Sequence, residues 1–255
     1  MLKHRVIPAL LLSSGGLVKT LKFMDPKYVG DPINAIRIFN EKEVDELLVL
    51  DITASKERRE PNYALIEKFA GECFMPLAYG GGVTNVEQAA RLFSLGVEKV
   101  CVQTAALRDS SLVTRLAARF GSQSVMVSVD VKRNWLGKVQ VYGSVDGKAL
   151  SEPWRELTQR LVNAGAGEVL LNIVNRDGTL AGPDLALIRE ATACLSVPLI
   201  AVGGVASLAD IKAAVEVGAS AVAAGSFFVF HGPHRAVLIT YPRYQELENL
   251  FKSTE

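Results

Sequence analysis

The sequence predicts an α/β fold: a single closed (βα)8 TIM barrel that spans residues 1–255 and consists of two similar half-barrels. Three observations favour this fold. The length of 255 residues is typical of one such barrel. Short β-type runs alternate with amphipathic helical patterns along the whole chain. The second half of the sequence also repeats features of the first half at a constant spacing. An open doubly wound sheet is the alternative that this alternation leaves open.

Eight candidate strands are rich in Val, Leu, Ile and Ala, as expected of strands with helices on one face and a packed interior on the other. They are Arg5–Leu11, Glu46–Asp51, Met75–Tyr79, Lys99–Gln103, Val125–Asp130, Glu168–Asn172, Leu199–Val202 and Ala221–Ala224. Helical periodicity is clearest in Val86–Leu95, Leu112–Phe120, Glu152–Ala164 and Leu208–Val217. Because a helical segment follows each strand, we expect the strands to pair in parallel and to close into a barrel.

An internal repeat relates the two halves, because adding 122 to a position in the first half reaches its counterpart in the second. Gly82 corresponds in this way to Gly204, and Thr104 corresponds to Ser226. The relation holds without a gap over roughly sixty residues, which favours two similar structural units. We therefore expect any ligand group that one half binds to be bound again by the other half.

The composition narrows the classes of partner and cofactor. The 28 Lys and Arg residues nearly balance the 27 Asp and Glu residues, which argues against nucleic acid as the main partner. Cys73, Cys101 and Cys194 fit neither a disulfide framework nor a metal spacing, so we expect a reducing cytoplasm. No membrane-spanning apolar run is evident. His231 and His234 lack a third ligand, so neither a metal nor another cofactor is expected.

Two glycine-rich loops at repeat-related positions predict phosphate binding. Gly80-Gly81-Gly82 and Gly203-Gly204 each lie between a strand and a helix. Glycine lets backbone N–H groups approach a phosphate closely, and the dipole of the following helix favours an anion. One strand later, Thr104 and Gly225-Ser226 can add a hydroxyl group and backbone donors. Tight turns without a ligand are the alternative, but two such loops favour a phosphorylated small molecule as partner.

Other polar residues follow the strands and predict an active site at the same end of the barrel. Asp130 ends an apolar strand, where it is either a general acid–base or a structural cap. Asp51 has the same place after the second strand and is either a second acid or a structural partner. Asn175-Arg176-Asp177-Gly178-Thr179 is either a ligand-binding loop or an ordinary turn. Lys19 either reaches over the mouth toward an anion or lies on the surface.

Charged residues also occur at the opposite ends of four strands. They are Arg5, Glu46, Lys99 and Glu168, at or near the starts of the first, second, fourth and sixth strands. If their side chains face inward they are half-buried and must pair, which would form a neutral ring across the barrel floor. Four unrelated surface charges are the alternative.

Taken together, these motifs resemble the cyclase subunit of imidazole glycerol phosphate synthase over essentially the whole chain. The resemblance is carried by Asp51-Ile52-Thr53-Ala54-Ser55, Tyr79-Gly80-Gly81-Gly82, Phe120-Gly121-Ser122-Gln123, Ala164-Gly165-Ala166-Gly167-Glu168, Asn175-Arg176-Asp177-Gly178-Thr179 and Gly203-Gly204. It implies that a glutaminase docks on the barrel floor. It also implies that ammonia passes through the barrel to a bisphosphorylated ribulosyl substrate at the top.

The resemblance implies roles for individual residues as well. Phosphate binding is implied for Gly82, Thr104, Asp177, Gly178, Gly204, Gly225 and Ser226. A charged gate for ammonia is implied for Arg5, Glu46, Lys99 and Glu168. Asp130 matches one of the two catalytic aspartates of the family, and Lys19, Asp51 and Gln103 are candidates for substrate contacts.

The departures from the family pattern bear on activity. Leu11 stands where the family has its first catalytic aspartate, and leucine cannot transfer protons. Losing one general acid–base typically slows a reaction about 10²–10⁴-fold. Ala9, Gln103 and Asn175 replace the family's cysteine, asparagine and aspartate at their positions. We therefore expect the cyclase activity of this chain to be very low.

Two further segments resemble a subgroup of the family, the second-copy homologues from surface-polysaccharide gene clusters. These segments are Val18-Lys19-Thr20-Leu21-Lys22-Phe23 and the stretch of residues 228–235. The subgroup implies a glutaminase partner and an N-acetyl sugar amidotransferase, with the barrel supplying ammonia for amidation of the sugar. An active cyclase of histidine biosynthesis that tolerates Leu11 is the first alternative. A sugar-phosphate isomerase and a purely structural scaffold are the others.

Overall fold

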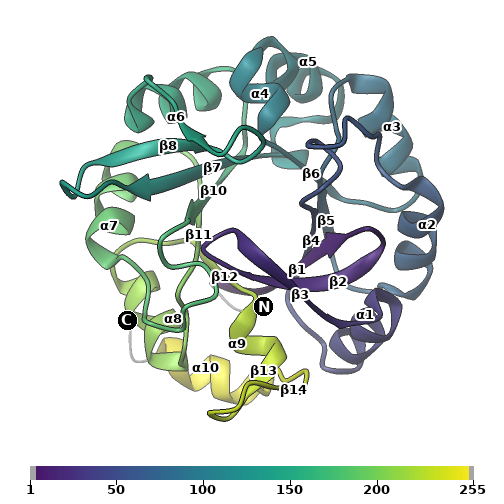
Figure 1. Ribbon diagram of the computed structural model, residues 1–255. Coiled ribbons are helices and arrows are strands. Elements are labelled where there is room, and N and C mark those ends of the chain that lie inside the picture. The colour runs from purple at the N-terminus through teal and green to yellow at the C-terminus, as the bar shows by residue number, and fades with distance from the viewer. Residues whose placement is uncertain (1–3, 253–255) are drawn as a thin grey trace.

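The structure is a computed structural model that describes residues 4–252, and it confirms the closed barrel (Figure 1). Its eight barrel strands, in order around the ring, are β1 (Arg5–Ser13), β4 (Leu47–Asp51), β5 (Leu77–Gly80), β6 (Lys99–Val102), β7 (Val125–Arg133), β10 (Glu168–Ile173), β11 (Leu199–Val202) and β12 (Ala221–Ala224). Each strand pairs in parallel with the next, and β12 pairs back onto β1 with Ala221 opposite Arg5. This closure excludes the open doubly wound sheet.

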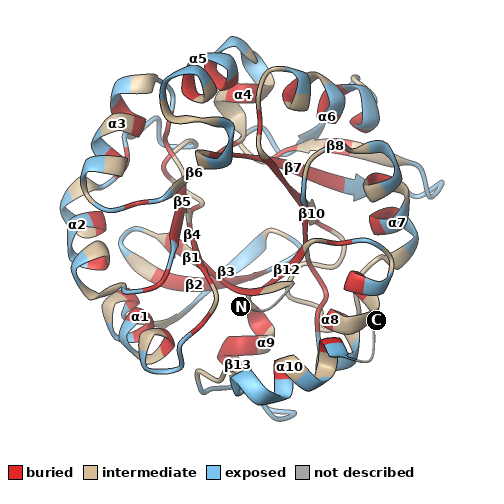
Figure 2. Cartoon of the chain, turned by 180° about the vertical axis from the view of Figure 1, so that it is seen from behind, coloured by how far each residue is buried: buried red, intermediate tan, exposed pale blue. Residues whose placement is uncertain are grey.

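Helices surround the barrel. They are α1 (Pro32–Glu41), α2 (Tyr63–Glu72), α3 (Val86–Ser94), α4 (Thr104–Arg108), α5 (Ser111–Phe120), α6 (Trp154–Asn163), α7 (Leu185–Cys194), α8 (Leu208–Glu216), α9 (Ser226–Val229) and α10 (Tyr244–Lys252), with a 3-10 turn at Ser122–Ser124. Their inner faces are buried against the strands and their outer faces are exposed (Figure 2). No helix within residues 4–252 is long and apolar enough to cross a membrane.

The element boundaries reproduce the internal repeat. The pairs α2 and α7, α3 and α8, β5 and β11, and β6 and β12 each begin and end 122 positions apart. Backbone conformation repeats as well, since φ is +74° at Gly82 and +93° at Gly204. This left-handed conformation favours glycine in both loops. The molecule is therefore built from two similar half-barrels.

The core has two layers because strand side chains alternate between the two faces of the barrel wall. One layer packs between strands and helices and includes Val6 and Leu47. The other fills the barrel interior and includes Ile7 and Leu48. The same alternation places Arg5 at the floor of β1 and Leu11 at its mouth, on the interior face.

Three hairpin elements at the carboxyl ends of the strands were not predicted. They are β2 (Gly16–Leu21) with β3 (Met24–Gly30), β8 (Val139–Gly143) with β9 (Lys148–Ala149), and β13 (Phe230–His231) with β14 (Ala236–Val237). The prediction that β7 ends at Asp130 is wrong, because the strand continues to Arg133 and pairs antiparallel with β8. The strand predicted from Glu46 instead begins at Leu47. That predicted from Met75 spans Leu77–Gly80.

Candidate active site

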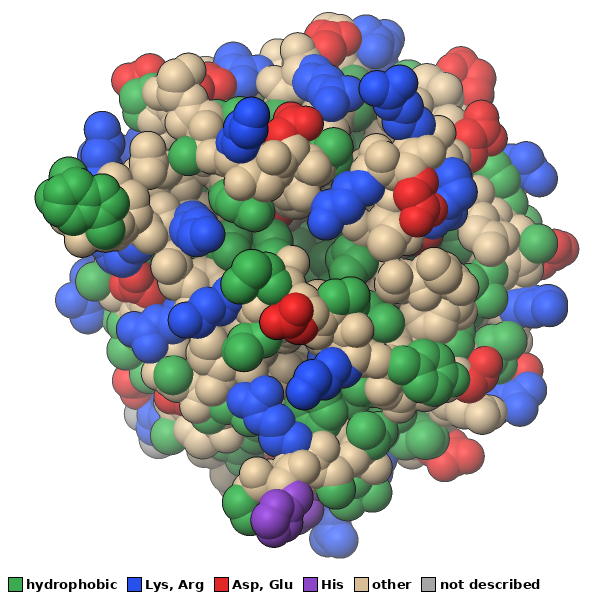
Figure 3. Space-filling model, in the orientation of Figure 1, with side chains coloured by type: hydrophobic (Ala, Val, Ile, Leu, Met, Phe, Trp, Pro, Cys, Tyr) green, Lys and Arg blue, Asp and Glu red, His purple; other side chains and the backbone are tan. Residues whose placement is uncertain are grey.

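A cavity of about 730 Å³ opens at the carboxyl ends of the barrel strands. Figure 3 shows the hollow at the centre of this face, with Lys and Arg side chains around its rim. Its lining includes most of the residues predicted for the mouth: Leu11, Lys19, Asp51, Gly82, Gln103, Thr104, Asp130, Asp177, Gly178, Gly204, Gly225 and Ser226. The two glycine loops, far apart in the sequence, thus share one cavity.

Asp130 is a buried carboxyl group in the lining of this cavity. It projects from β7, is 5% exposed, and accepts hydrogen bonds from Gln103 Nε2 at 2.5 Å, from Ser128 Oγ at 3.0 Å and from Ser144 Oγ. Burial raises the pKa of Asp130 to about 6, although these three donors oppose the increase. A carboxyl group that titrates near 6 can accept and return a proton close to neutral pH.

Ser128 and Ser144 are site residues that the sequence analysis missed. Ser128 lies two positions before Asp130 on the same strand, so strand alternation alone could have placed it in the interior. Ser144 follows β8, a strand without a clear sequence pattern, and no signal could have found it. Gln103 Nε2 also donates to Ser144 Oγ at 2.7 Å. The candidate substrate contact Gln103 thus orients the Asp130 carboxylate.

The β1 side of the cavity is apolar at its rim. Leu11 lines the cavity there and lies opposite Val18 of the adjoining hairpin strand. Lys19 is the nearby polar group of this hairpin: it is 5% exposed, and its Nζ donates to Ala9 O at 2.6 Å. Burial lowers the pKa of Lys19 to about 8, while Asp177 opposes the decrease. The interpretation of Lys19 as a solvated surface residue is therefore wrong.

The hairpin of β2 and β3 is fastened to the loop that follows β10. Asp177 Oδ2 accepts hydrogen bonds from Thr20 Oγ1 at 2.7 Å and from Phe23 N at 3.1 Å. Burial raises the pKa of Asp177. A Cβ atom on Gly178 would lie 2.1 Å from Thr20 O, so only glycine permits this approach. The structure thus gives Asp177 and Gly178 contacts to the hairpin, and their phosphate role stays a prediction.

The two glycine loops have matching geometry. A Cβ atom would lie 2.5 Å from Arg59 O at Gly82 and 2.3 Å from Gly182 O at Gly204. Both loops therefore depend on glycine to pass beside another segment of backbone. Thr104 and Ser226 begin the short helices α4 and α9 beside them. This duplicated arrangement offers two places for anionic groups at opposite sides of one cavity.

Two other candidates have structural contacts in this fold. Asp51 Oδ1 accepts hydrogen bonds from Thr53 N at 3.0 Å, from Thr53 Oγ1 at 2.9 Å and from Ala54 N at 2.9 Å. These bonds favour the structural interpretation of Asp51 over the acid. Asn175 Oδ1 accepts from Arg133 N at 2.6 Å, and its Nδ2 donates to Arg133 O at 3.3 Å. Asn175 is absent from the cavity lining.

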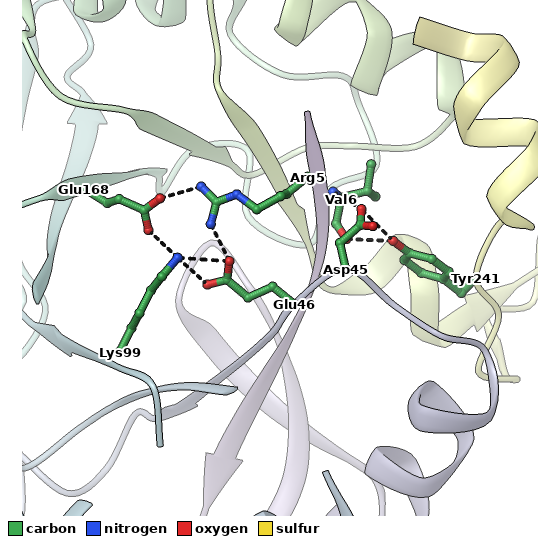
Figure 4. A network of polar contacts seen from close by, with 7 residues as sticks. All are labelled: Arg5, Val6, Asp45, Glu46, Lys99, Glu168 and Tyr241. Atoms are coloured by element: carbon green, nitrogen blue, oxygen red, sulfur yellow. Dashed lines mark hydrogen bonds and ion pairs between the residues drawn. The ribbon is translucent and has the colours of Figure 1, made fainter. Parts of the chain in front are cut away.

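The four charged residues at the opposite end contact one another in a closed ring (Figure 4). The Arg5 guanidinium donates to the carboxylates of Glu46 and Glu168. Lys99 Nζ lies 3.1 Å from Glu46 Oε2 and 2.9 Å from Glu168 Oε2. Each charge therefore has two partners of opposite sign. The interpretation of these residues as unrelated surface charges is wrong, and a role as a gate stays a prediction.

The cavity extends from the mouth toward this ring. Its lining includes Leu48, Cys101 and Leu170, which belong to the interior apolar layer. Leu48 lies two residues above Glu46, which corresponds to roughly 7 Å of strand. The interior between ring and mouth is apolar and uncharged at this level. Within residues 4–252, no group of three or more His, Cys, Asp or Glu residues could hold a metal ion.

Fold and site together define the chain as a (βα)8 barrel of two half-barrels with a shared cavity at the carboxyl ends of its strands. The profile of a family described as "Histidine biosynthesis protein" matches residues 5–234. The chain is 54% identical over 249 residues to the "Putative imidazole glycerol phosphate synthase subunit hisF2" of Pseudomonas aeruginosa, covering 97% of this chain and 99% of the relative. It is 39% identical over 233 residues to the "Imidazole glycerol phosphate synthase subunit HisF" of Thermobifida fusca, covering 89% and 90%.

A relative in Leptospira interrogans, named "Putative imidazole glycerol phosphate synthase subunit HisF", is 46% identical over 255 residues and is covered completely. The chain therefore belongs to the HisF-type family of imidazole glycerol phosphate synthase cyclase subunits.

Proposed function

We propose that this chain accepts ammonia from a glutaminase partner at the barrel floor and conducts it through the barrel. In this proposal the ammonia serves the glutamine-dependent amidation of an N-acetyl sugar in surface-polysaccharide biosynthesis, with an N-acetyl sugar amidotransferase as a further partner. One contrast between the two ends of the barrel carries the proposal. The four charged residues at the floor are fully paired with one another. At the mouth, Leu11 occupies the position at which closure of an imidazole ring requires a second proton-transferring group.

The floor ring has the properties of a gate for a small neutral molecule. Both carboxylates of the neutral ring are already paired with Arg5 and Lys99, which leaves no partner for an ammonium ion, and the apolar layer above the ring disfavours any charge. Neutral ammonia meets neither penalty. The Lys99 ammonium group lies at the end of one flexible side chain. Displacement of this side chain breaks the contacts to both Glu46 and Glu168, while Arg5 still bridges the two carboxylates. A glutaminase docked on the floor would deliver ammonia directly to this point.

The residues at the mouth favour ring closure less than the residues at the floor favour ammonia conduction. Closing an imidazole ring requires proton transfers at more than one atom, and Asp130 can serve only one position at a time. Leucine makes the β1 side of the mouth apolar, so a water molecule is poorly held there as a substitute. The chain is therefore expected to pass ammonia on more readily than to use it.

A second candidate function is an active cyclase of histidine biosynthesis. The pKa of Asp130 near 6 and the two glycine loops favour it, because they offer an acid–base and places for two phosphates. The likeness to HisF of Thermobifida fusca points the same way. A scaffold without ammonia passage differs from both candidates, because it would bind the glutaminase without transferring glutamine-derived nitrogen.

The rate of ring closure separates the two candidates. The purified chain and HisF of Thermobifida fusca would be assayed side by side with free ammonia and the bisphosphorylated ribulosyl substrate of the family. We expect the chain to form imidazole glycerol phosphate at least about 100-fold more slowly. A rate within about tenfold of that enzyme would contradict the proposal and favour the histidine pathway.

The anion sites can be tested without turnover. Crystals soaked in inorganic phosphate should show density beside Gly82 and Thr104, beside Gly204, Gly225 and Ser226, or at both places. Empty sites at high phosphate concentration would count against a bisphosphorylated ligand.

Passage of ammonia is tested with a glutaminase, an N-acetyl sugar amidotransferase and its sugar acceptor, supplied together with amide-labelled glutamine. We expect the label to reach the sugar when this chain is present and not when it is omitted. Equal labelling with and without the chain would contradict conduction through the barrel.

A further inference from the structure

The first residues of β1 lack a strand neighbour on one side. Pairing with β12 begins at Arg5, but the register with β4 begins only at Ala9, opposite Leu48. Backbone groups that point toward β4 below this level need other partners, because buried N–H and C=O groups are costly when left unpaired. This gap lies at the floor, directly beside the ring of charges (Figure 4).

Two side chains fill the gap. Asp45 Oδ2 accepts a hydrogen bond from Val6 N at 3.0 Å, and the Tyr241 hydroxyl donates to Val6 O at 2.8 Å. The Tyr241 hydroxyl also lies 3.4 Å from Asp45 Oδ2, so the three groups form one cluster. Tyr241 precedes α10 and packs against Phe228 of α9 with ring centroids 5.3 Å apart. Burial raises the pKa of Tyr241, so its hydroxyl stays protonated and able to donate.

We propose that Asp45 and Tyr241 form a clamp that positions Arg5 within the floor ring. Val6 follows Arg5 in the chain, and Asp45 precedes Glu46, so one cluster of hydrogen bonds fixes the backbone beside both ring residues. Neither clamp residue contacts the ring carboxylates, so both are positioning residues. The consequence for ammonia passage rests on the proposed gate function, whereas the placement of Arg5 does not.

The clamp matters because Arg5 spans the ring. Its Nη1 donates to Glu46, which immediately precedes β4, and its Nη2 donates to Glu168, the first residue of β10. Holding two separate carboxylates at once requires a fixed origin for the guanidinium, because each of its two charge-assisted hydrogen bonds depends on distance and direction. If the backbone at Val6 is released, Lys99 alone has to bridge Glu46 and Glu168. The ring then loses its closed pairing.

The test uses variants that remove single hydrogen-bonding groups. Tyr241→Phe deletes only the hydroxyl, Asp45→Ala deletes the carboxylate, and Asp45→Asn leaves an oxygen that can still accept from Val6 N. Tyr244→Phe is the matched control, because this tyrosine is nearby in the chain but 53% exposed. Arg5 is observed through its Nε–Hε NMR signal, assigned by its loss in Arg5→Lys, and Val6 through amide hydrogen exchange.

We expect Tyr241→Phe and Asp45→Ala to shift or broaden the Arg5 signal and to accelerate exchange at Val6 by about tenfold. Asp45→Asn should have a smaller effect, and Tyr244→Phe should have none. If Asp45→Ala does not fold, Tyr241→Phe gives the same readout with a smaller perturbation. An unchanged Arg5 signal in folded Tyr241→Phe, and in Asp45→Ala where it folds, would overturn the proposal.

A second measurement separates the clamp from the gate. In Tyr241→Phe and Asp45→Ala, the Arg5 signal is compared with the transfer of the amide label from glutamine to the sugar. The transfer is measured with the glutaminase bound and with the amidotransferase and sugar acceptor present. A displaced Arg5 with reduced transfer supports both proposals. A displaced Arg5 with normal transfer supports the clamp but contradicts the gate function of the ring. An undisplaced Arg5 overturns the clamp whatever happens to transfer.

Discussion

The floor and the mouth of this barrel differ in how completely their polar groups are matched. At the floor, two cations and two carboxylates each have two partners of opposite charge. At the mouth, Asp130 of β7 faces the β1 side of the cavity, where Leu11 is the β1 residue at the rim. Strand β1 contributes to both ends, with Arg5 and Leu11 separated by roughly 20 Å of strand. Complete charge pairing at the floor therefore does not depend on a second acid at the mouth.

Restoring the missing acid should give the largest effect. Leu11→Asp is expected to raise ammonia-dependent ring closure by about 10²–10⁴-fold, because it supplies a second proton-transferring group opposite Asp130. Product formation is measured with free ammonia, so no glutaminase is needed. Leu11→Asn is the control, since it is polar and of similar size but cannot transfer protons. An equal gain in both variants would show that polarity, and not acid–base chemistry, limits the mouth.

Breaking the floor ring should lower stability strongly. Glu46→Ala removes the shared partner of Arg5 and Lys99 from a site where the glutamate is 2% exposed. Breaking a buried ion pair costs about 3 kcal/mol of unfolding free energy. Urea denaturation measures the loss, and Glu248→Ala, which breaks the exposed pair with Lys252, should change little. A loss no larger than that of the control would show that the ring does not stabilise the floor.

Much of the barrel could be predicted because its signals are local. The strands are contiguous apolar runs, and the repeat placed Gly82 and Gly204 in equivalent loops before any contact was known. The ring was suggested by the unusual charges at strand starts, Arg5 and Glu46 among them. Such features depend on composition and spacing within a few residues, which a sequence displays directly.

The missed features depend on contacts between distant segments. Ser144 reaches Asp130 only because β8 pairs antiparallel with the extension of β7. Tyr241 reaches Val6 across more than 200 positions of chain, and an isolated tyrosine near a helix gives no hint of that partner. Asp51 faced two interpretations, and only the hydrogen bonds to Thr53 distinguished them. Hydrogen-bond partners of this kind are set by tertiary packing.

The mouth should also give a pH-dependent signature. The pKa of Asp130 is raised from 3.8 to about 6 by burial, so the fold favours the protonated acid. Its contribution to stability is therefore present below about pH 4 and is lost as the pH rises through 6. Relative to the parent protein, Asp130→Asn should be more stable at pH 8 than at pH 4 by about 2 kcal/mol. Unfolding free energies at pH 4, 6 and 8 measure the trend, and a constant difference would contradict the burial argument.

The smallest effect concerns the rim of the mouth. Asn175 differs from the family's aspartate, but its amide bonds both backbone groups of Arg133 and lies outside the cavity lining. Aspartate can accept from Arg133 N but cannot donate to Arg133 O, so Asn175→Asp should cost about 1 kcal/mol of stability. The double variant Leu11→Asp with Asn175→Asp should close the imidazole ring at the same rate as Leu11→Asp alone, because the side chain at position 175 lies outside the cavity lining. Rates of the single and double variants are compared directly. A double variant about tenfold faster than Leu11→Asp alone would show that Asn175 acts at the site and that it limits ring closure together with Leu11.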